Sequence, residues 1–334
     1  MRITIRPRRP VWALALLAPA IPELLTGSTP VSRLVLDPPG FLLSFGFDVW
    51  LYGTGALLIR EAAVALRKGW ASILLWGGAY GIGEEGFAVH TFFERSGPPV
   101  GALEAYGSAY GVNGLWALGL TIFHATYSIA LPILVTRLWF PEARGARWFD
   151  RSAVAALAVL YLGVVAFFSL LVGHGPSAEA FALFLGLALV LLVGGARLPG
   201  DAIRARPGPR RTGRYGLALA GALEWAAWLL VLIASGTHRF SAWLAAGLLI
   251  ALDGLALYVL ARRIGTVDVE RSLYAVAVGM LVPLFLWDAV LEPSVPGILG
   301  VAALLAYLLY RLGRTVDARA LLVAVPAGTP PRAA

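Results

Sequence analysis

The sequence predicts an all-α fold, a polytopic transmembrane helical bundle of about ten helices with both termini in the cytoplasm. The 334 residues are 59% hydrophobic and 14% charged, whereas about a quarter of the residues in a soluble domain are charged. The apolar residues form long continuous runs, and the arginines gather in alternate connections. Continuous runs favour helices over alternating strands, because only helices and closed barrels satisfy their backbone hydrogen bonds in lipid.

The first predicted helix covers about 11–25 and follows a basic N-terminal segment. This apolar run is short for a membrane span, and a basic segment before a short apolar core is also typical of a signal peptide. Glu23 and the polar turn at 26–30 lead directly into more apolar sequence. We therefore expect a retained helix, with a cleaved signal peptide as the alternative.

Nine further apolar runs are each close to the roughly 20 residues that cross a bilayer. They cover about 41–64, 70–93, 114–138, 152–172, 177–196, 214–235, 240–261, 272–291 and 296–311. Basic residues are abundant in every second connection, as in cytoplasmic loops, and the opposite connections contain only Arg33, Arg95 and Arg239. A missed helix would invert every later loop, so this asymmetry supports ten spans.

The net charge of +8 does not indicate a nucleic-acid partner, because the basic residues follow the membrane topology and form no single face. We expect the plasma membrane as location, and anionic lipid headgroups at the cytoplasmic face as partners of the arginines. The chain has no cysteine, which excludes disulfides, thiolate metal sites and a cysteine nucleophile.

The Pro-, Gly- and Arg-rich segment 198–212 is the one clear break in composition. It predicts a cytoplasmic linker between a six-helix half, 1–197, and a four-helix half, 213–320. Residues 321–334 are expected to form a disordered tail. The six-helix half contains the polar residues that point to function.

The segment from Gly77 to His90 places two carboxylates and a histidine in a glycine-rich apolar run. An ionisable group at the centre of a membrane costs roughly 2.5–3.5 kcal/mol on insertion scales, so it normally lies in a bundle interior or a water-filled cavity. Helical rise places Glu85 roughly 12 Å, and His124 of the next helix roughly 14 Å, from the outer surface. We therefore expect Glu84, Glu85 and His124 to converge as a catalytic site.

The two glutamates are expected to have different roles. Adjacent helical residues diverge by about 100°, so only one of them should face His124. Glu85 shares a stripe with Gly81, a small residue that lets a neighbouring helix approach. We predict that Glu85 faces His124 and acts chemically, while Glu84 turns toward the second helix or back toward the first and orients or balances the site, with Asp48 as a candidate partner.

Five further residues are expected to bind substrate or to support this catalytic set. Thr121, His124 and Ser128 recur at i, i+3 and i+7, so the fourth helix presents one polar stripe. The other candidates lie at similar depth or nearer the outer interface. The five supporting residues are Glu23, Asp48, His90, Thr121 and Ser128.

The remaining membrane carboxylates are expected to be structural hydrogen-bond partners, a role that contributes about 0.6 kcal/mol on average. They are Glu224, Asp253, Asp288 and Glu292. His174 and His238 fall in predicted outer loops, where we expect them to be solvated.

Glu84-Glu85, followed about forty residues later by Phe123-His124 and Ser128, resembles the glutamic-type intramembrane protease clan over residues 77–132. This clan includes the CAAX-processing and bacteriocin-immunity enzymes and the anti-sigma-factor site-1 proteases. A basic residue after the Glu pair and a second histidine motif, which those families have, are missing here. The resemblance implies a similar helical core and a hydrolase, since a carboxylate paired with imidazole can activate water.

Other classes remain open at this point. Two carboxylates and one or two histidines can hold zinc or iron, but no His-Glu-x-x-His pair occurs, so the sequence predicts no metal and no cofactor. A buried Glu–His set also suits a proton-coupled small-molecule transporter, with Asp48, Glu224 and Asp253 extending a relay. A non-enzymatic membrane scaffold would need no pocket. The sequence does not identify a membrane protein or lipid substrate.

Overall fold

A computed structural model of the chain describes residues 8–93, 106–172, 175–203, 213–237, 241–264, 269–291 and 296–324. These residues are mostly helical, and their strands are limited to β1 (Ser108–Ala109) and β2 (Val112–Asn113), which confirms the predicted all-α fold. In chain order the helices are α1 (Arg8–Pro19), η1 (Ala20–Leu24), α2 (Ser32–Leu36), α3 (Pro38–Asp48), η2 (Val49–Gly53), α4 (Thr54–Ala65), α5 (Trp70–Gly81), η3 (Ile82–Ala88), η4 (Thr91–Phe93), α6 (Gly114–Phe123), η6 (His124–Ala130), α7 (Leu131–Trp139), η7 (Pro141–Ala143), α8 (Arg151–Val172), α9 (Ala178–Arg197), α10 (Arg214–Gly236), α11 (Ala242–Arg263), α12 (Val269–Leu291) and α13 (Ile298–Ala324).

Eight of these helical segments are long and apolar enough to cross a membrane. They are Pro38–Ala65, Gly114–Trp139, Arg151–Val172, Ala178–Arg197, Arg214–Gly236, Ala242–Arg263, Val269–Trp287 and Ile298–Ala320. The two other predicted spans are also helical, as α1–η1 and α5–η3. The first is short, with 12 and 5 residues in its two parts, and the second contains the Glu pair. The number ten therefore remains a prediction.

Side-chain caps fix where several helices begin. A polar residue before the first turn accepts a hydrogen bond from a backbone N–H that has no partner within the helix. Asn113 caps α6 at 3.0 Å, Asp150 caps α8 at 2.7 Å, and Ser177 and Ser241 cap α9 and α11, each at 3.2 Å. These caps set the register of four predicted spans.

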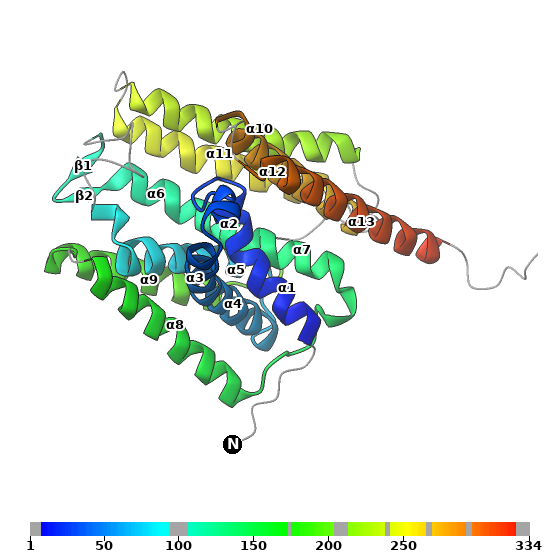
Figure 1. Cartoon of the computed structure of the whole chain (residues 1–334), viewed down its shortest axis with the longest axis horizontal. Helices are drawn as coiled ribbons and strands as arrows, with labels where there is room; N and C mark the ends of the chain where they lie inside the picture. The colour runs from blue at the N-terminus through cyan, green and yellow to red at the C-terminus, as the bar shows by residue number, and fades with distance from the viewer. Residues whose placement is uncertain are drawn as a thin grey trace, which may run out of the picture.

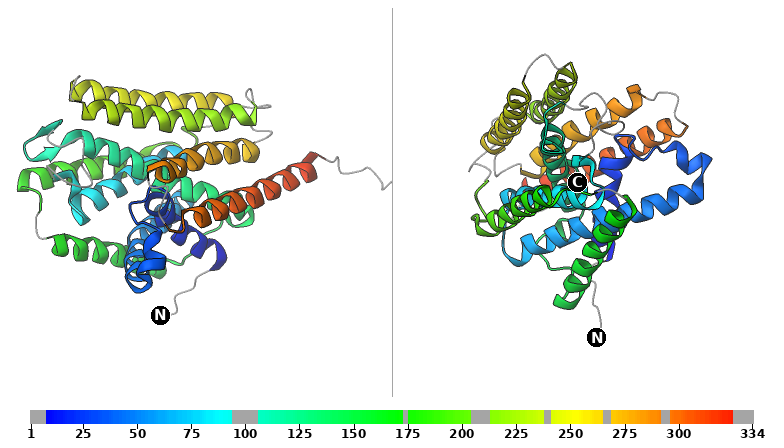
Figure 2. Two further views of the ribbon diagram at one scale, coloured as in Figure 1. Left: turned by 45° about the horizontal axis from the view of Figure 1, so that its top comes forward. Right: turned by 90° about the vertical axis from the view of Figure 1, so that its left-hand side faces the viewer.

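The segment Gly114–Trp139, which joins α6, η6 and α7, lies at the centre of the molecule, and we call it the central helix. One side of it, with Tyr127, Leu131 and Leu134, packs in a hydrophobic core with α10 to α13. Ile129 and Ile133 pack in a second core with α1, α4, α5 and α8. The paired α10 and α11 run along one edge of the molecule, and α8 runs along another (Figure 1; Figure 2, left).

Both predicted halves therefore contact the same central helix. The division of the chain into 1–197 and 213–320 stays a prediction. Part of the expected linker, 204–212, and most of the expected tail, 325–334, lie outside the described residues, and α13 continues to Ala324. The same holds for His174, His238 and Glu292, and for the side chain of Asp288.

A buried ion pair at the end of α4 holds the connection between α7 and α8. Arg60 and Glu61, 3% and 1% exposed, form an ion pair, and the Arg60 guanidinium stacks 3.6 Å from the centre of the Trp148 ring. Arg60 also donates to the carbonyl of Ala143 at 2.7 Å, and Glu61 accepts the Trp148 backbone N–H at 3.0 Å. We call these residues the Arg60–Glu61 lock.

The predicted orientation is testable at connections that the structure describes. A reporter fused after Arg147, in a connection rich in arginine, is expected to report the cytoplasm, because basic loops are retained there. A reporter fused near Gly175, between α8 and α9, is expected to report the exterior. An exterior signal after Arg147 would contradict the proposed topology.

Candidate functional site

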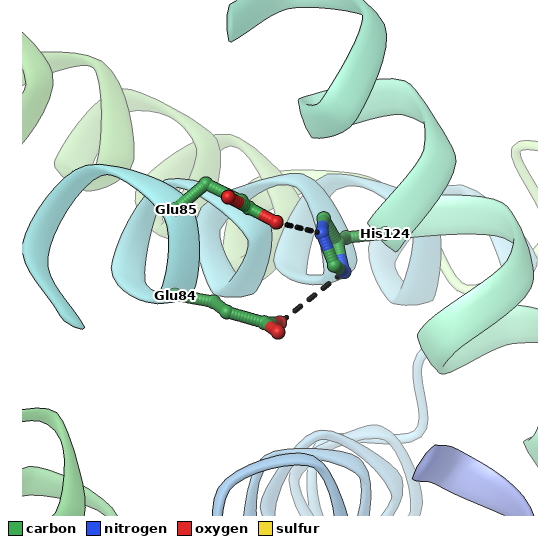
Figure 3. Close-up of side chains that lie close together, drawn as sticks. All are labelled: Glu84, Glu85 and His124. Atoms are coloured by element: carbon green, nitrogen blue, oxygen red, sulfur yellow. Dashed lines mark hydrogen bonds and ion pairs between the residues drawn. The ribbon is translucent and has the colours of Figure 1, made fainter. Parts of the chain in front are cut away.

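Glu84, Glu85 and His124 meet in the interior of the protein (Figure 3). Both glutamates project from η3, and His124 begins η6 of the central helix. Glu85 Oε1 lies 2.9 Å from His124 Nε2, and Glu84 Oε2 lies 3.2 Å from His124 Nδ1. Each ring nitrogen therefore faces one carboxylate, so a doubly protonated imidazole would have an anionic partner on both sides.

Neighbouring hydroxyl groups fix these side chains. Ser128 Oγ lies 2.9 Å from His124 Nδ1, one turn further along the central helix. The Thr91 hydroxyl donates to Glu85 Oε2 and lies 3.3 Å from the indole nitrogen of Trp116. Glu85 is therefore held by His124 through one oxygen and by Thr91 through the other.

The expectation that only one glutamate faces His124 is wrong. It assumed an α-helix, but residues Ile82–Ala88 form a π-helix, with a hydrogen bond of 2.9 Å from the Val89 N–H to the Glu84 carbonyl. An i→i+5 bond encloses one residue more than an α-helical bond, so adjacent side chains diverge less. Glu84 consequently contacts His124, and not Asp48 as expected.

Glycines allow α5 and the central helix to approach closely just before η3. A Cβ atom at Gly77 would lie 2.8 Å from the Cα of Ala125, and one at Gly81 would lie 2.9 Å from the Cβ of His124. Both distances are too short for real side chains, so the two helices can pack this closely only with glycine on α5. This close contact brings the ring of His124 within reach of both glutamates.

Two tyrosines pack against the imidazole and a third packs against one of them, and none of the three was predicted as part of the site. The ring centres of Tyr52 and Tyr80 lie 6.0 and 6.1 Å from that of His124, and Tyr161 lies 5.9 Å from Tyr80. Tyr52 comes from η2 and Tyr161 from α8. Isolated tyrosines in apolar runs carry no distinguishing signal in sequence, and Thr91 was missed for the same reason.

The five supporting candidates differ in whether they contact the cluster of Glu84, Glu85 and His124. Glu23 joins the site indirectly, because its carboxylate accepts from Tyr52 at 2.5 Å and from Thr29 at 3.1 Å. Thr121 packs against Gly78 and Gly81 through its carbon atoms. Asp48 ends α3, and its buried Oδ2 has no hydrogen-bond partner among the described residues.

His90 belongs to a neighbouring cavity. This cavity has a volume of about 550 Å³ and is lined by residues that include Phe87, Ser169, Gly175 and Phe181. His90 Nε2 lies 3.2 Å from Ser169 Oγ, and the backbone of His90 has φ +61°, a left-handed conformation that is uncommon outside glycine. Phe87 of η3 and His90 just after it contribute to this lining.

The cluster of Glu84, Glu85 and His124 can also be considered as a metal site. One ligand atom from each of Glu84, Glu85 and His124 lies within 4.8 Å of the others. Two carboxylates and an imidazole are ligands that zinc and iron accept. Glu84 Oε2 is buried and has no hydrogen-bond partner among the described residues apart from its ion-pair contact with His124. The donor set therefore fits a divalent ion as well as a metal-free acid–base pair.

The fold and the site define a multi-pass helical membrane protein with a buried carboxylate–imidazole cluster. A model of an uncharacterized membrane protein family matches residues 13–325, so the chain belongs to that family. No curated protein and no solved structure matches the chain significantly. The resemblance to the glutamic-type intramembrane protease clan therefore has no support from these comparisons.

Proposed function

We propose that this protein is an intramembrane hydrolase in which Glu85 activates water against a membrane-embedded substrate. The observation that carries the proposal is the 2.9 Å contact between Glu85 Oε1 and His124 Nε2 in an interior where both ionisable side chains are buried. Ionisable groups at such positions are expensive and commonly functional. A carboxylate and an imidazole in contact supply the base and the electrophile that hydrolysis needs.

The reaction would begin when Glu85 takes a proton from a water molecule whose oxygen attacks a carbonyl carbon. The electron pair of the carbonyl bond moves onto its oxygen, where a protonated His124 stabilises the negative charge. When the tetrahedral intermediate collapses, the leaving group takes the proton back from Glu85. Glu84, 3.2 Å from the other ring nitrogen, keeps the imidazole charged and oriented throughout.

Exposure distinguishes the two glutamates. The side chain of Glu85 is 11% exposed, whereas those of Glu84 and His124 are 4% and 3% exposed. Water reaches Glu85 more easily, which supports Glu85 as the base. Glu84 is better suited to a positioning role, because it is enclosed by the helices around it.

The proposal also includes the membrane in which the protein lies and its orientation there. We infer a plasma-membrane protein with both termini in the cytoplasm, whose arginine-rich connections contact anionic headgroups. The substrate would be a membrane protein or a lipid, because the site lies within a predicted span and away from the aqueous loops.

A proton-coupled carrier is the second candidate, and one observation favours it. Tyr52 packs against His124 and donates to Glu23, so ionisable groups continue from the cluster toward η1. Such a line can conduct protons in a transporter. A carrier forms no new covalent bond, and this difference separates the two candidates experimentally.

The test uses ¹⁸O-labelled water. Membranes that contain the wild-type protein or Glu85→Gln are incubated in H₂¹⁸O, and labelled carboxylates on peptides and lipids are identified by mass spectrometry. Hydrolysis places one oxygen atom from water in the product, so we expect labelled products that need Glu85. Glu179→Gln, which removes an exposed carboxylate at the start of α9, is the control and should behave as wild type.

The same labelled products from wild type and Glu85→Gln would overturn the proposal. A transport phenotype that is lost in Glu85→Gln without any ¹⁸O-labelled product would favour the carrier.

A further inference from the structure

A second cavity lies between the central helix and α10 to α12, and the first part of α5 also contributes to its lining. It has a volume of about 840 Å³, inside the range of roughly 300–1,000 Å³ for pockets that bind drug-sized ligands. Residues of the central helix, α10, α11 and α12 line it, and we call it the α10–α11 cavity. Its walls are almost entirely apolar, with Glu224 and Asp253 as the only charged residues among those that line it.

Glu224 of α10 and Asp253 of α11 both line the α10–α11 cavity. Two carboxylates at one buried site disfavour each other's ionisation, so we expect the pair to hold one proton and a charge of −1. Asp253 Oδ2 is buried and has no hydrogen-bond partner among the described residues. The charge of the pair is therefore not neutralised by a basic residue of the cavity wall.

The cavity reaches the outside of the bundle between α10 and α11. Leu223 and Leu255, which belong to its lining, are 57% and 58% exposed. Exposed leucines on membrane-spanning helices face the lipid chains, so an apolar molecule can enter from the bilayer. Glu224 and Asp253 lie near the middle of their helices, at positions 11 and 12 of segments of 23 and 22 residues.

We propose that the α10–α11 cavity is a binding site for a lipophilic monovalent cation, a molecule with a bulky apolar or aromatic body and one positive charge. The apolar walls accept the body, and the carboxylate pair supplies the matching charge where water is scarce and electrostatic attraction is strong. A lipid chain alone would leave the negative charge of the carboxylate pair without a counter-charge, which is costly. An anion of the same shape would be repelled.

The proposal is tested with two ions of similar shape and opposite charge, tetraphenylphosphonium and tetraphenylborate. The purified full-length protein is placed in nanodiscs of neutral lipid, and the binding of each ion above that of empty nanodiscs is measured by equilibrium dialysis. We expect saturable binding of the phosphonium at one site and no saturable binding of the borate. The double variant Glu224→Gln/Asp253→Asn, which keeps the shape of both side chains and removes the charge of the pair, should weaken phosphonium binding at least ~10-fold.

Two further variants make the result specific. Ala256→Phe, which places a ring in the cavity without changing its charge, should also weaken binding. Glu85→Gln removes a buried carboxylate from the other site and should leave phosphonium binding unchanged, so this test is independent of the proposed hydrolase. Thermal melting of each variant in nanodiscs shows whether it is folded.

Equal binding of the two ions, or wild-type affinity in the folded double variant, would overturn the proposal. Saturable binding that survives Ala256→Phe would place the phosphonium elsewhere and would overturn it as well.

Discussion

Glu85→Gln is expected to lower kcat/KM by about 10²–10⁴-fold, the usual contribution of a general base, in a protein that still inserts and folds. The amide keeps the size of the carboxylate and can still contact Thr91 and His124, but it does not take a proton from water. Glu84→Gln is expected to cost mainly stability and less than about 10-fold in rate, because its effect passes through the orientation of His124. The rates are measured on the labelled product identified with ¹⁸O-water.

Glu85→Asp is the informative control for this pair. It keeps the base but withdraws it by one methylene from His124 Nε2, so an intermediate rate is expected if proton transfer and position both matter. If Glu84→Gln loses as much activity as Glu85→Gln while both proteins fold, then the assignment of the base to Glu85 is wrong.

Arg60→Ala is expected to lower the free energy of unfolding by about 3–5 kcal/mol, because it leaves the buried Glu61 without its partner. The Arg60–Glu61 lock also loses the stacking on Trp148 and the hydrogen bond to the Ala143 carbonyl. Denaturation with sodium dodecyl sulfate in mixed micelles, followed by tryptophan fluorescence, measures this change.

The matched control is Arg147→Ala. Arg147 lies 4.0 Å from Glu61, but its side chain is 45% exposed, and exposed ion pairs contribute only about 0–1 kcal/mol. Arg147→Ala should therefore change the free energy of unfolding by less than about 1 kcal/mol. Similar losses in the two variants would mean that burial of the pair does not determine its contribution.

Helix positions could be predicted from sequence because hydropathy and arginine asymmetry act over whole segments. All ten predicted spans are helical in the structure, including the segment with Glu84 and Glu85. The proximity of Glu85 and His124 could be predicted from depth alone. Consecutive membrane helices with a short connection commonly pack side by side, so two residues at equal depth on them lie close together. The glycine-rich stretch also pointed to the close approach between α5 and the central helix.

The angular placement of side chains could not be predicted, because it depends on local helix type and on packing. Glu84 reaches His124 only because the π-helix narrows the angle between adjacent residues. Tyr52 and Tyr161 come from distant segments, and apolar runs do not reveal which faces pack together. Arg60 and Glu61 look like ordinary residues at the end of a membrane span, and only the structure shows that they are buried.

The π-helices make the site depend on the exact number of residues in each helix. Four of them occur in the described residues, as η1, η2, η3 and η6, and they contain Glu23, Tyr52, the Glu pair and His124. Each wide turn holds one residue more than the α-helical turn that it replaces, so shortening η3 or η6 by one residue would restore a regular helix and rotate everything beyond it by about 100°. An alignment with a single gap at the deletion would still pair Glu with Glu and His with His, although only one of the two chains would bring them together. The number of residues in each helical turn therefore determines this cluster as much as the identity of its side chains does.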